Sequence, residues 1–149
     1  MQNKIYWYCF KRQLEELYYF LFFEKFISCD AEEFISHFTG KKFRIEKSYS
    51  RKLMWNKEKY LLLSVINHLF KKKFIDSDHS DILKKHFDDM PDSILDDFNK
   101  SKNKPKAKKL QAKLVILFPS ETGYRCKQRL YYKARNKESA FTVLKNCGI

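Results

Sequence analysis

The sequence predicts an α+β fold that is mainly helical and rich in aromatic residues, with a basic C-terminal β-hairpin and a terminal helix. Aromatic residues make up 17% of the 149 residues, which is enough to build a substantial core. Three glycines and three prolines are too few for a turn-dense all-β sandwich or a disordered chain. Apolar residues recur at helical spacing in the first two thirds of the chain, whereas alternation is stronger after residue 110.

The N-terminal part is expected to contain two helices after a short strand or helix start at residues 4–10. Apolar spacing predicts a helix over residues 11–27, and Asp30 begins a capping-box pattern for a second, short helix that Gly40 would terminate. The apolar run at residues 17–23 predicts core burial, with a partner surface as the alternative. The residues assigned to that partner surface are Tyr18, Tyr19, Phe20 and Phe23.

The central stretch, residues 53–87, predicts two helices joined by a polar turn. Asn56 is expected to cap the first helix, whose apolar side covers more than half of its circumference. Three lysines at 71–73 suit the C-terminal end of that helix, where the dipole favours cations. Turn residues at 76–80 precede a short second helix with its apolar face at 82–87, and this arrangement is typical of a helical hairpin or a helix-turn-helix.

Positive charge is concentrated in the C-terminal third of the chain. Residues 99–149 contain 14 Lys and Arg and two Glu, a net charge of +12, whereas residues 1–98 contain 17 Lys and Arg and 16 acids, a net charge of +1. This asymmetry favours a polyanionic partner over a role in solubility alone. We divide the chain into a helical core (1–98), a basic linker (99–109) and a basic hairpin with a final helix (110–149), all within one compact domain.

The C-terminal part is predicted to contain a β-hairpin. Residues 110–118 and 124–133 alternate between two kinds of side chain, and a five-residue turn at 119–123 joins them. In the second strand, one face is mostly apolar and the other is basic. A helix over residues 105–118 is the alternative, because several of its leucines also fit helical spacing; the strand is preferred. A last helix is expected over residues 137–146.

The basic linker and the basic face of the hairpin form the predicted nucleic-acid site. Cations neutralise phosphates, and exposed tyrosines can stack on unpaired bases. Lysines outnumber arginines 25 to 6, which favours contact with the backbone over bidentate reading of guanine. The expected partner is RNA or a protein–RNA complex, with DNA as the alternative, and the oligomeric state is left open. The assigned residues are Lys100, Lys102, Lys104, Lys106, Lys108, Lys109, Arg125, Lys127, Arg129, Tyr131, Lys133, Arg135 and Lys137.

The sequence contains no recognisable catalytic, cofactor or metal motif. The four cysteines lack CxxC spacing, and three glycines cannot build a phosphate-binding loop, so no cofactor or metal is expected. His79 and His86 are the closest approach to an acid–base pair, and the aspartates at 88–97 are expected to form a solvated face. The apolar run at residues 17–23 is too short to span a membrane, and we expect a cytoplasmic protein with reduced thiols.

A tryptophan, a helix that ends in a leucine, a short turn and a phenylalanine follow one another in the central stretch. The residues of this pattern are Met54, Trp55, Leu62, Ile66, Leu69, Phe74, Ile75, Ile82, Leu83, His86 and Phe87. The pattern resembles regulators carried by conjugative transposons. The resemblance implies a mobile-element setting and a helix-turn-helix-like unit, and it transfers no functional residues. In its size, lysine content and lack of motifs, the chain is also similar to anti-CRISPR proteins, the phage inhibitors of RNA-guided nucleases.

We therefore expect a non-enzymatic protein of phage or mobile-element origin that binds nucleic acid or a nucleoprotein. Its most concrete form is an anti-CRISPR-type inhibitor that acts on an RNA-guided nuclease or its guide RNA. The first alternative is a helix-turn-helix-like DNA-binding transcription regulator of a mobile element, which would use the central helical pair. The second alternative is a small nuclease that uses the same basic surface.

Overall fold

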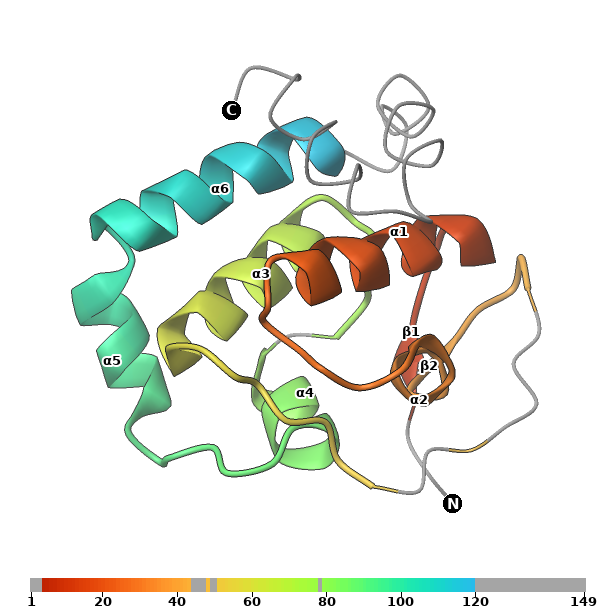
Figure 1. Cartoon of the computed structure of the whole chain (residues 1–149), viewed down its shortest axis with the longest axis horizontal. Coiled ribbons are helices and arrows are strands. Elements are labelled where there is room, and N and C mark those ends of the chain that lie inside the picture. The colour runs from red at the N-terminus through yellow and green to blue at the C-terminus, as the bar shows by residue number, and fades with distance from the viewer. Residues whose placement is uncertain (1–3, 44–47, 49–50, 78, 120–149) are drawn as a thin grey trace.

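The structure of the chain is a computed structural model that describes residues 4–43, 48, 51–77 and 79–119 (Figure 1). This described part contains six helices and one two-stranded parallel sheet, so the mainly helical content is confirmed, and the small sheet is consistent with the α+β class. No helix within these ranges is both long enough and apolar enough to cross a membrane. In chain order the elements are β1 (Ile5–Tyr6), α1 (Lys11–Phe23), α2 (Ala31–Ile35), β2 (Phe38–Thr39), α3 (Lys59–Lys71), α4 (His79–His86), α5 (Ile94–Ser101) and α6 (Pro105–Leu117).

Helix α3 lies at the centre of the described part, and nine of its 13 residues are buried (Figure 1). A helix that is apolar on so much of its surface must be covered from several sides. Helices α4, α5 and α6 pack against it. On another side, Leu62 and Ile66 of α3 and Leu17 of α1 line the same core cavity of about 30 Å³.

Helices α1 and α3 end in the same way, each with a lysine in the left-handed conformation. Lys25 has φ 65° and Lys73 has φ 63°. In both cases the next residue, Phe26 or Phe74, is buried and its N–H reaches back to a carbonyl of the last helical turn at 2.9 Å. This is the Schellman arrangement, in which an apolar residue after the cap packs back against the helix. The two phenylalanines therefore fix where the chain leaves each helix.

Helix α2 begins as the sequence predicts, but the residues around it differ from expectation. The Oδ1 atom of Asp30 accepts a hydrogen bond from the N–H of Glu33 at 2.8 Å, which confirms Asp30 as the N-cap. Gly40 does not terminate the helix, because β2 lies between them. Its lack of a side chain instead allows close packing: a Cβ atom there would lie 2.5 Å from the carbonyl oxygen of Trp7.

The short parallel sheet joins the start of the chain to the residues after α2. Ile5 is paired with Phe38 and Tyr6 with Thr39, which confirms a strand in this region. Trp7 extends the link through an antiparallel bridge to Ile75, just after α3. The N-terminal residues therefore connect α2 and α3, although neither link is visible in local sequence patterns.

Helix α3 begins later than the sequence predicts. Its N-cap is Glu58 and its first helical residue is Lys59, so the prediction that Asn56 caps the helix is wrong. The backbone N–H of Asn56 donates to the carbonyl oxygen of Phe26 at 2.8 Å instead, which ties the loop before α3 to the end of α1.

The predicted strand at residues 110–118 is wrong, because Pro105–Leu117 form helix α6. Leu110, Leu114 and Leu117 are buried at helical spacing, whereas Ala112, which the strand would turn toward the core, is exposed. Proline at the first helical position favours the start of a helix here, because the missing N–H would have no partner inside the helix. The predicted turn from residue 120 onward, the second strand at 124–133 and the last helix at 137–146 lie outside the described residues.

The helical assignment of α6 predicts which substitutions destabilise the protein. Leu117→Ala should lower the free energy of unfolding by about 2–4 kcal/mol, because it removes a buried side chain and leaves a cavity. Ala112→Gln should change it by no more than about 0.5 kcal/mol, because residue 112 is exposed. Urea denaturation followed by circular dichroism measures both values. A strand with residues 110, 112 and 114 facing the core would give the opposite ranking.

Candidate nucleic-acid interface

Six lysines assigned to the nucleic-acid site from sequence are all exposed in the structure. They do not lie on a separate linker, because α5 ends at Ser101 and α6 begins at Pro105, so most of residues 99–109 are helical. Helix α6 is held in place by its buried apolar face, which packs on α3. We call the following residues the lysine surface: Lys100, Lys102, Lys104, Lys106, Lys108 and Lys109.

The lysine surface lies in a stretch without negative charge. Residues 99–119 contain seven lysines and no Asp or Glu. The buried side of α6 carries Ala107, Leu110, Leu114 and Leu117, so the lysines are directed away from the core. Two adjacent residues differ in position: Lys109 lines a groove beside α6, whereas Lys108 does not. The other assigned cationic and aromatic residues, Arg125, Lys127, Arg129, Tyr131, Lys133, Arg135 and Lys137, lie outside the described residues.

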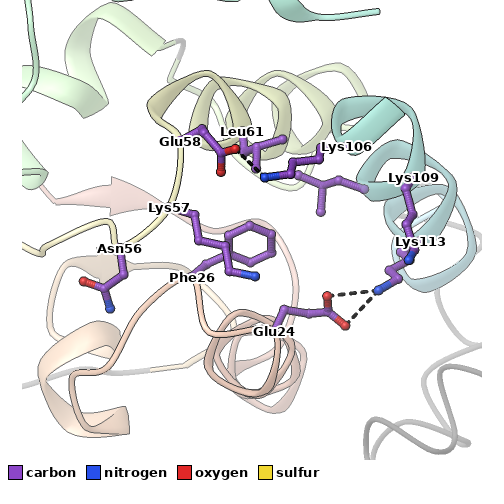
Figure 2. Close-up of a pocket in the computed structure, with 10 residues that line it drawn as sticks. Glu24, Phe26, Asn56, Lys57, Glu58, Leu61, Lys106, Lys109 and Lys113 are labelled. Carbon is purple, nitrogen blue, oxygen red and sulfur yellow. Dashed lines mark hydrogen bonds and ion pairs between the residues drawn. The ribbon is translucent and has the colours of Figure 1, made fainter. Parts of the chain in front are cut away.

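A groove with a volume of about 420 Å³ lies between α6 and the ends of α1 and α3 (Figure 2). Its apolar lining includes Leu61 of α3 and Leu110 of α6. Its charged lining comes from three parts of the chain that are far apart in sequence. These charged residues are Glu24, Lys57, Glu58, Lys106, Lys109 and Lys113.

Two ion pairs join α6 to the opposite wall of the groove (Figure 2). The Nζ atom of Lys113 contacts both carboxylate oxygens of Glu24, at 2.9 and 3.0 Å, and each side chain is only 12% exposed. The Nζ atom of Lys106 lies 2.6 Å from Oε2 of Glu58, and this pair is open to solvent. The hydrogen bond from Lys106 lowers the pKa of the Glu58 carboxyl below its usual value.

The wall opposite α6 is built on stacked aromatic rings. The ring of Phe26 stacks on Trp55 with 4.8 Å between centroids and 16° between planes. The Nζ atom of Lys57 lies 5.0 Å from the centroid of the Phe26 ring, within reach of a cation–π interaction. Local sequence patterns do not assign Glu24, Lys57 or Glu58 to a site. The lysine partners of Glu58 and Glu24 lie 48 and 89 residues away along the chain, and Lys57 lies over the ring of Phe26 from a distant segment.

Part of the predicted partner surface on α1 belongs to the core. Tyr18 is 5% exposed and Phe20 is 1% exposed, so this part of the prediction is wrong. The hydroxyl of Tyr18 donates to the carbonyl oxygen of Cys29 at 2.7 Å, and burial raises its pKa to about 12. Tyr19 and Phe23 are half-buried, and their assignment to a partner surface stays a prediction.

His86 pairs with His37 rather than with His79. The two Nδ1 atoms are 2.9 Å apart, and both side chains are buried. The Nε2 atom of His37 lies 3.1 Å from the carbonyl oxygen of Arg51; if His37 donates there, its Nδ1 accepts from His86. Burial, followed by the nearby His86, lowers the pKa of His37 to about 4. With both imidazoles neutral, this hydrogen bond links the residues after α2 to the last residue of α4.

The aspartates between residues 88 and 97 are exposed: three lie in the connection between α4 and α5, and Asp96 and Asp97 lie in the first turn of α5. Within the described ranges, no group of three or more His, Cys, Asp and Glu side chains could hold a metal ion.

Comparisons with known proteins do not place the chain in a family: no protein-family model matches it, and no curated protein and no solved structure is similar to it.

The half-buried ion pair between Lys113 and Glu24 is expected to stabilise the attachment of α6. Lys113→Met should lower the free energy of unfolding by about 1–3 kcal/mol, because it leaves a poorly solvated carboxylate. A double-mutant cycle of Lys113→Met with Glu24→Gln gives the coupling free energy of this pair. It should be larger than the coupling free energy from the matched cycle of Lys106→Met with Glu58→Gln, because the side chains of that second pair are exposed. Urea denaturation measures both cycles. Equal couplings would show that burial does not strengthen the Lys113 pair.

The pair of His37 and His86 predicts a loss of stability in acid. The pKa of His37 is about 4 in the folded protein and 6.5 for a free side chain, so the unfolded chain takes up the proton first. The free energy of unfolding should therefore fall as the pH is lowered from about 6.5 to about 4, by on the order of 3 kcal/mol from this group. Burial lowers the pKa of His68 as well, which acts in the same direction.

Urea denaturation across this pH range tests the prediction. His37→Gln should reduce the pH dependence without abolishing it, because His68 contributes the remainder. The control is His79→Gln, which changes a half-buried histidine outside the pair, so that the two variants are compared at the same pH values. An unchanged slope in His37→Gln would contradict the assignment.

Proposed function

We propose that this protein binds nucleic acid through the lysine surface and does not catalyse a reaction. The proposed partner is RNA, alone or in a complex with protein. The observation that carries the proposal is that the six exposed lysines of the lysine surface lie between the last turn of α5 and the middle of α6, in a stretch (residues 99–119) that contains no acidic residue; the aspartates of α5 lie in its first turn. A surface with one sign of charge attracts polyanions and speeds their encounter.

The composition of this surface supports contact with phosphates rather than the reading of a base sequence. Its cations are all lysines, whose ammonium groups act as point charges and lack the planar fork with which arginine recognises guanine. The packing of α6 on α3 supports it as well, because lysines on a fixed helix need less ordering on binding than lysines on a flexible linker. We expect affinity that depends on salt and little preference for sequence.

The central helices support a DNA-binding regulator less well. A helix-turn-helix joins its two helices by three or four residues, whereas residues 72–78 separate α3 from α4, a connection of seven residues. Helix α4 also has only eight residues. For these reasons we base the proposed function on α5 and α6, and the regulator remains an alternative prediction.

The most specific form of the proposal is an inhibitor of RNA-guided nucleases, of phage or mobile-element origin. The channel that holds the guide duplex in such enzymes is itself positively charged. A protein with a lysine surface would be repelled by that channel and would compete for the guide RNA instead. Release of the inhibition by added guide RNA would support this mechanism, and inhibition that excess guide RNA leaves unchanged would contradict it.

The lysine surface should determine the salt dependence of RNA binding. Fluorescence anisotropy with a labelled single-stranded RNA across a salt series measures the slope of log affinity against log salt. The triple variant Lys100→Gln/Lys102→Gln/Lys108→Gln removes three exposed cations that do not line the groove. It should reduce the slope by about 2, because each phosphate contact on a single strand contributes about 0.7.

The matched control is Lys71→Gln/Lys84→Gln/Lys85→Gln, which removes three exposed lysines at the ends of α3 and α4. It lowers the net charge equally and should affect the slope much less. Equal effects of the two triple variants would show that total charge, and not the lysine surface, drives binding. If RNA does not bind to the wild-type protein at low salt, the proposed function is wrong.

A further inference from the structure

Two ion pairs span the groove beside α6 (Figure 2). The pair of Glu58 and Lys106 crosses it at one end, and the pair of Glu24 and Lys113 crosses it at the other. Lys57 and Lys109 lie between these pairs, on opposite walls. Among the described residues, neither lysine lies within ion-pair distance of a carboxylate: Lys57 lies over the Phe26 ring, although its charge also helps to lower the pKa of the Glu58 carboxyl.

The charges in the groove do not balance. Four lysines and two glutamates line it, which gives a net charge of +2, and both glutamates are already paired with lysines. A group with two negative charges would match this site.

We propose that the groove binds the terminal phosphate of a nucleic-acid strand whose remaining phosphates lie on the lysine surface; this inference rests on the proposed function. A terminal phosphate is a monoester with nearly two negative charges at neutral pH and three free oxygens, whereas an internal phosphate is a diester with one charge. Lys57 and Lys109 contact the monoester from opposite walls.

The two ion pairs explain why the site takes an end rather than the middle of a strand. A continuous strand that passes along the groove would place a phosphate near the carboxylate of Glu24 or Glu58 at each end. The repulsion is strongest at Glu24, which is only 12% exposed and poorly screened by water, and weaker at the more exposed Glu58. A strand end avoids both, because the rest of the strand leaves the groove over α6, where residues 99–119 contain no acid. The groove volume of about 420 Å³ lies within the range of small-molecule sites.

Binding of matched RNAs tests this inference. Three labelled single-stranded RNAs of one sequence carry a 5′-phosphate, a 3′-phosphate or hydroxyls at both ends. The wild-type protein should bind one or both phosphorylated RNAs roughly tenfold or more tightly than the hydroxyl form, as expected for a charge-assisted site. The preference should decrease below about pH 6, where the dianionic monoester takes up a proton and keeps only one negative charge.

Two double variants locate the site. Lys57→Gln/Lys109→Gln should abolish the preference, and it should weaken the hydroxyl RNA less than the control below does, because only Lys109 of this pair belongs to the lysine surface. The control Lys102→Gln/Lys108→Gln removes two exposed lysines outside the groove and should weaken all three RNAs while it keeps the preference. Both pairs of substitutions are exposed, and circular dichroism confirms that the variants are folded.

The outcomes separate this inference from the proposed function. If wild-type protein binds all three RNAs equally, the terminal-phosphate site is wrong and the proposed function stands. If the preference survives in Lys57→Gln/Lys109→Gln, or disappears in Lys102→Gln/Lys108→Gln, the groove is not the site. If none of the RNAs binds at low salt, the proposed function is overturned, and this inference is overturned with it.

Discussion

The need to cover α3 on several sides determines the arrangement of the other elements. Nine of its 13 residues are buried, including polar ones such as Ser64 and His68. The hydroxyl of Ser64 bonds to the carbonyl oxygen of Tyr60, and Nε2 of His68 lies 2.7 Å from the carbonyl oxygen of Phe118, so neither side chain is left unsatisfied. The second bond also fixes the end of α6 against α3. A lysine-rich helix thus acquires a fixed position because its neighbour has apolar surface to bury.

Local patterns in the sequence predict the helices well when the apolar period is unambiguous. Helices α1, α3 and α4 are found close to their expected positions, since their apolar residues fit a period of 3.6 and not a period of two. Helix α6 is predicted incorrectly because Leu110 and Leu114 fit both periods. Positions 112 and 117 distinguish the two periods, because the helix exposes residue 112 and buries residue 117. The proline at 105 also indicates a helix start, but the alternation after it was given more weight.

The candidate site is only partly predictable for a different reason. The exposed lysines follow from composition, but their neighbours follow from contacts over long sequence separations. Lys106 meets Glu58 across 48 residues and His37 meets His86 across 49, and no local period encodes such pairs. Counting charges along the sequence therefore overstates the free cations on α6, because Lys106 and Lys113 are each held by a carboxylate.

The ion pair between Lys106 and Glu58 gives the lysine surface a second property. A phosphate that binds Lys106 must compete with Glu58. The same ammonium group therefore serves both the ligand and the ion pair that links α6 to the start of α3. Thermodynamic linkage makes this competition reciprocal. A change that weakens the contact between Lys106 and Glu58 raises the affinity for the phosphate, and binding of the phosphate weakens that contact by the same free energy. A phosphate bound to the lysine surface would therefore weaken the ion pair at the N-terminal end of α3.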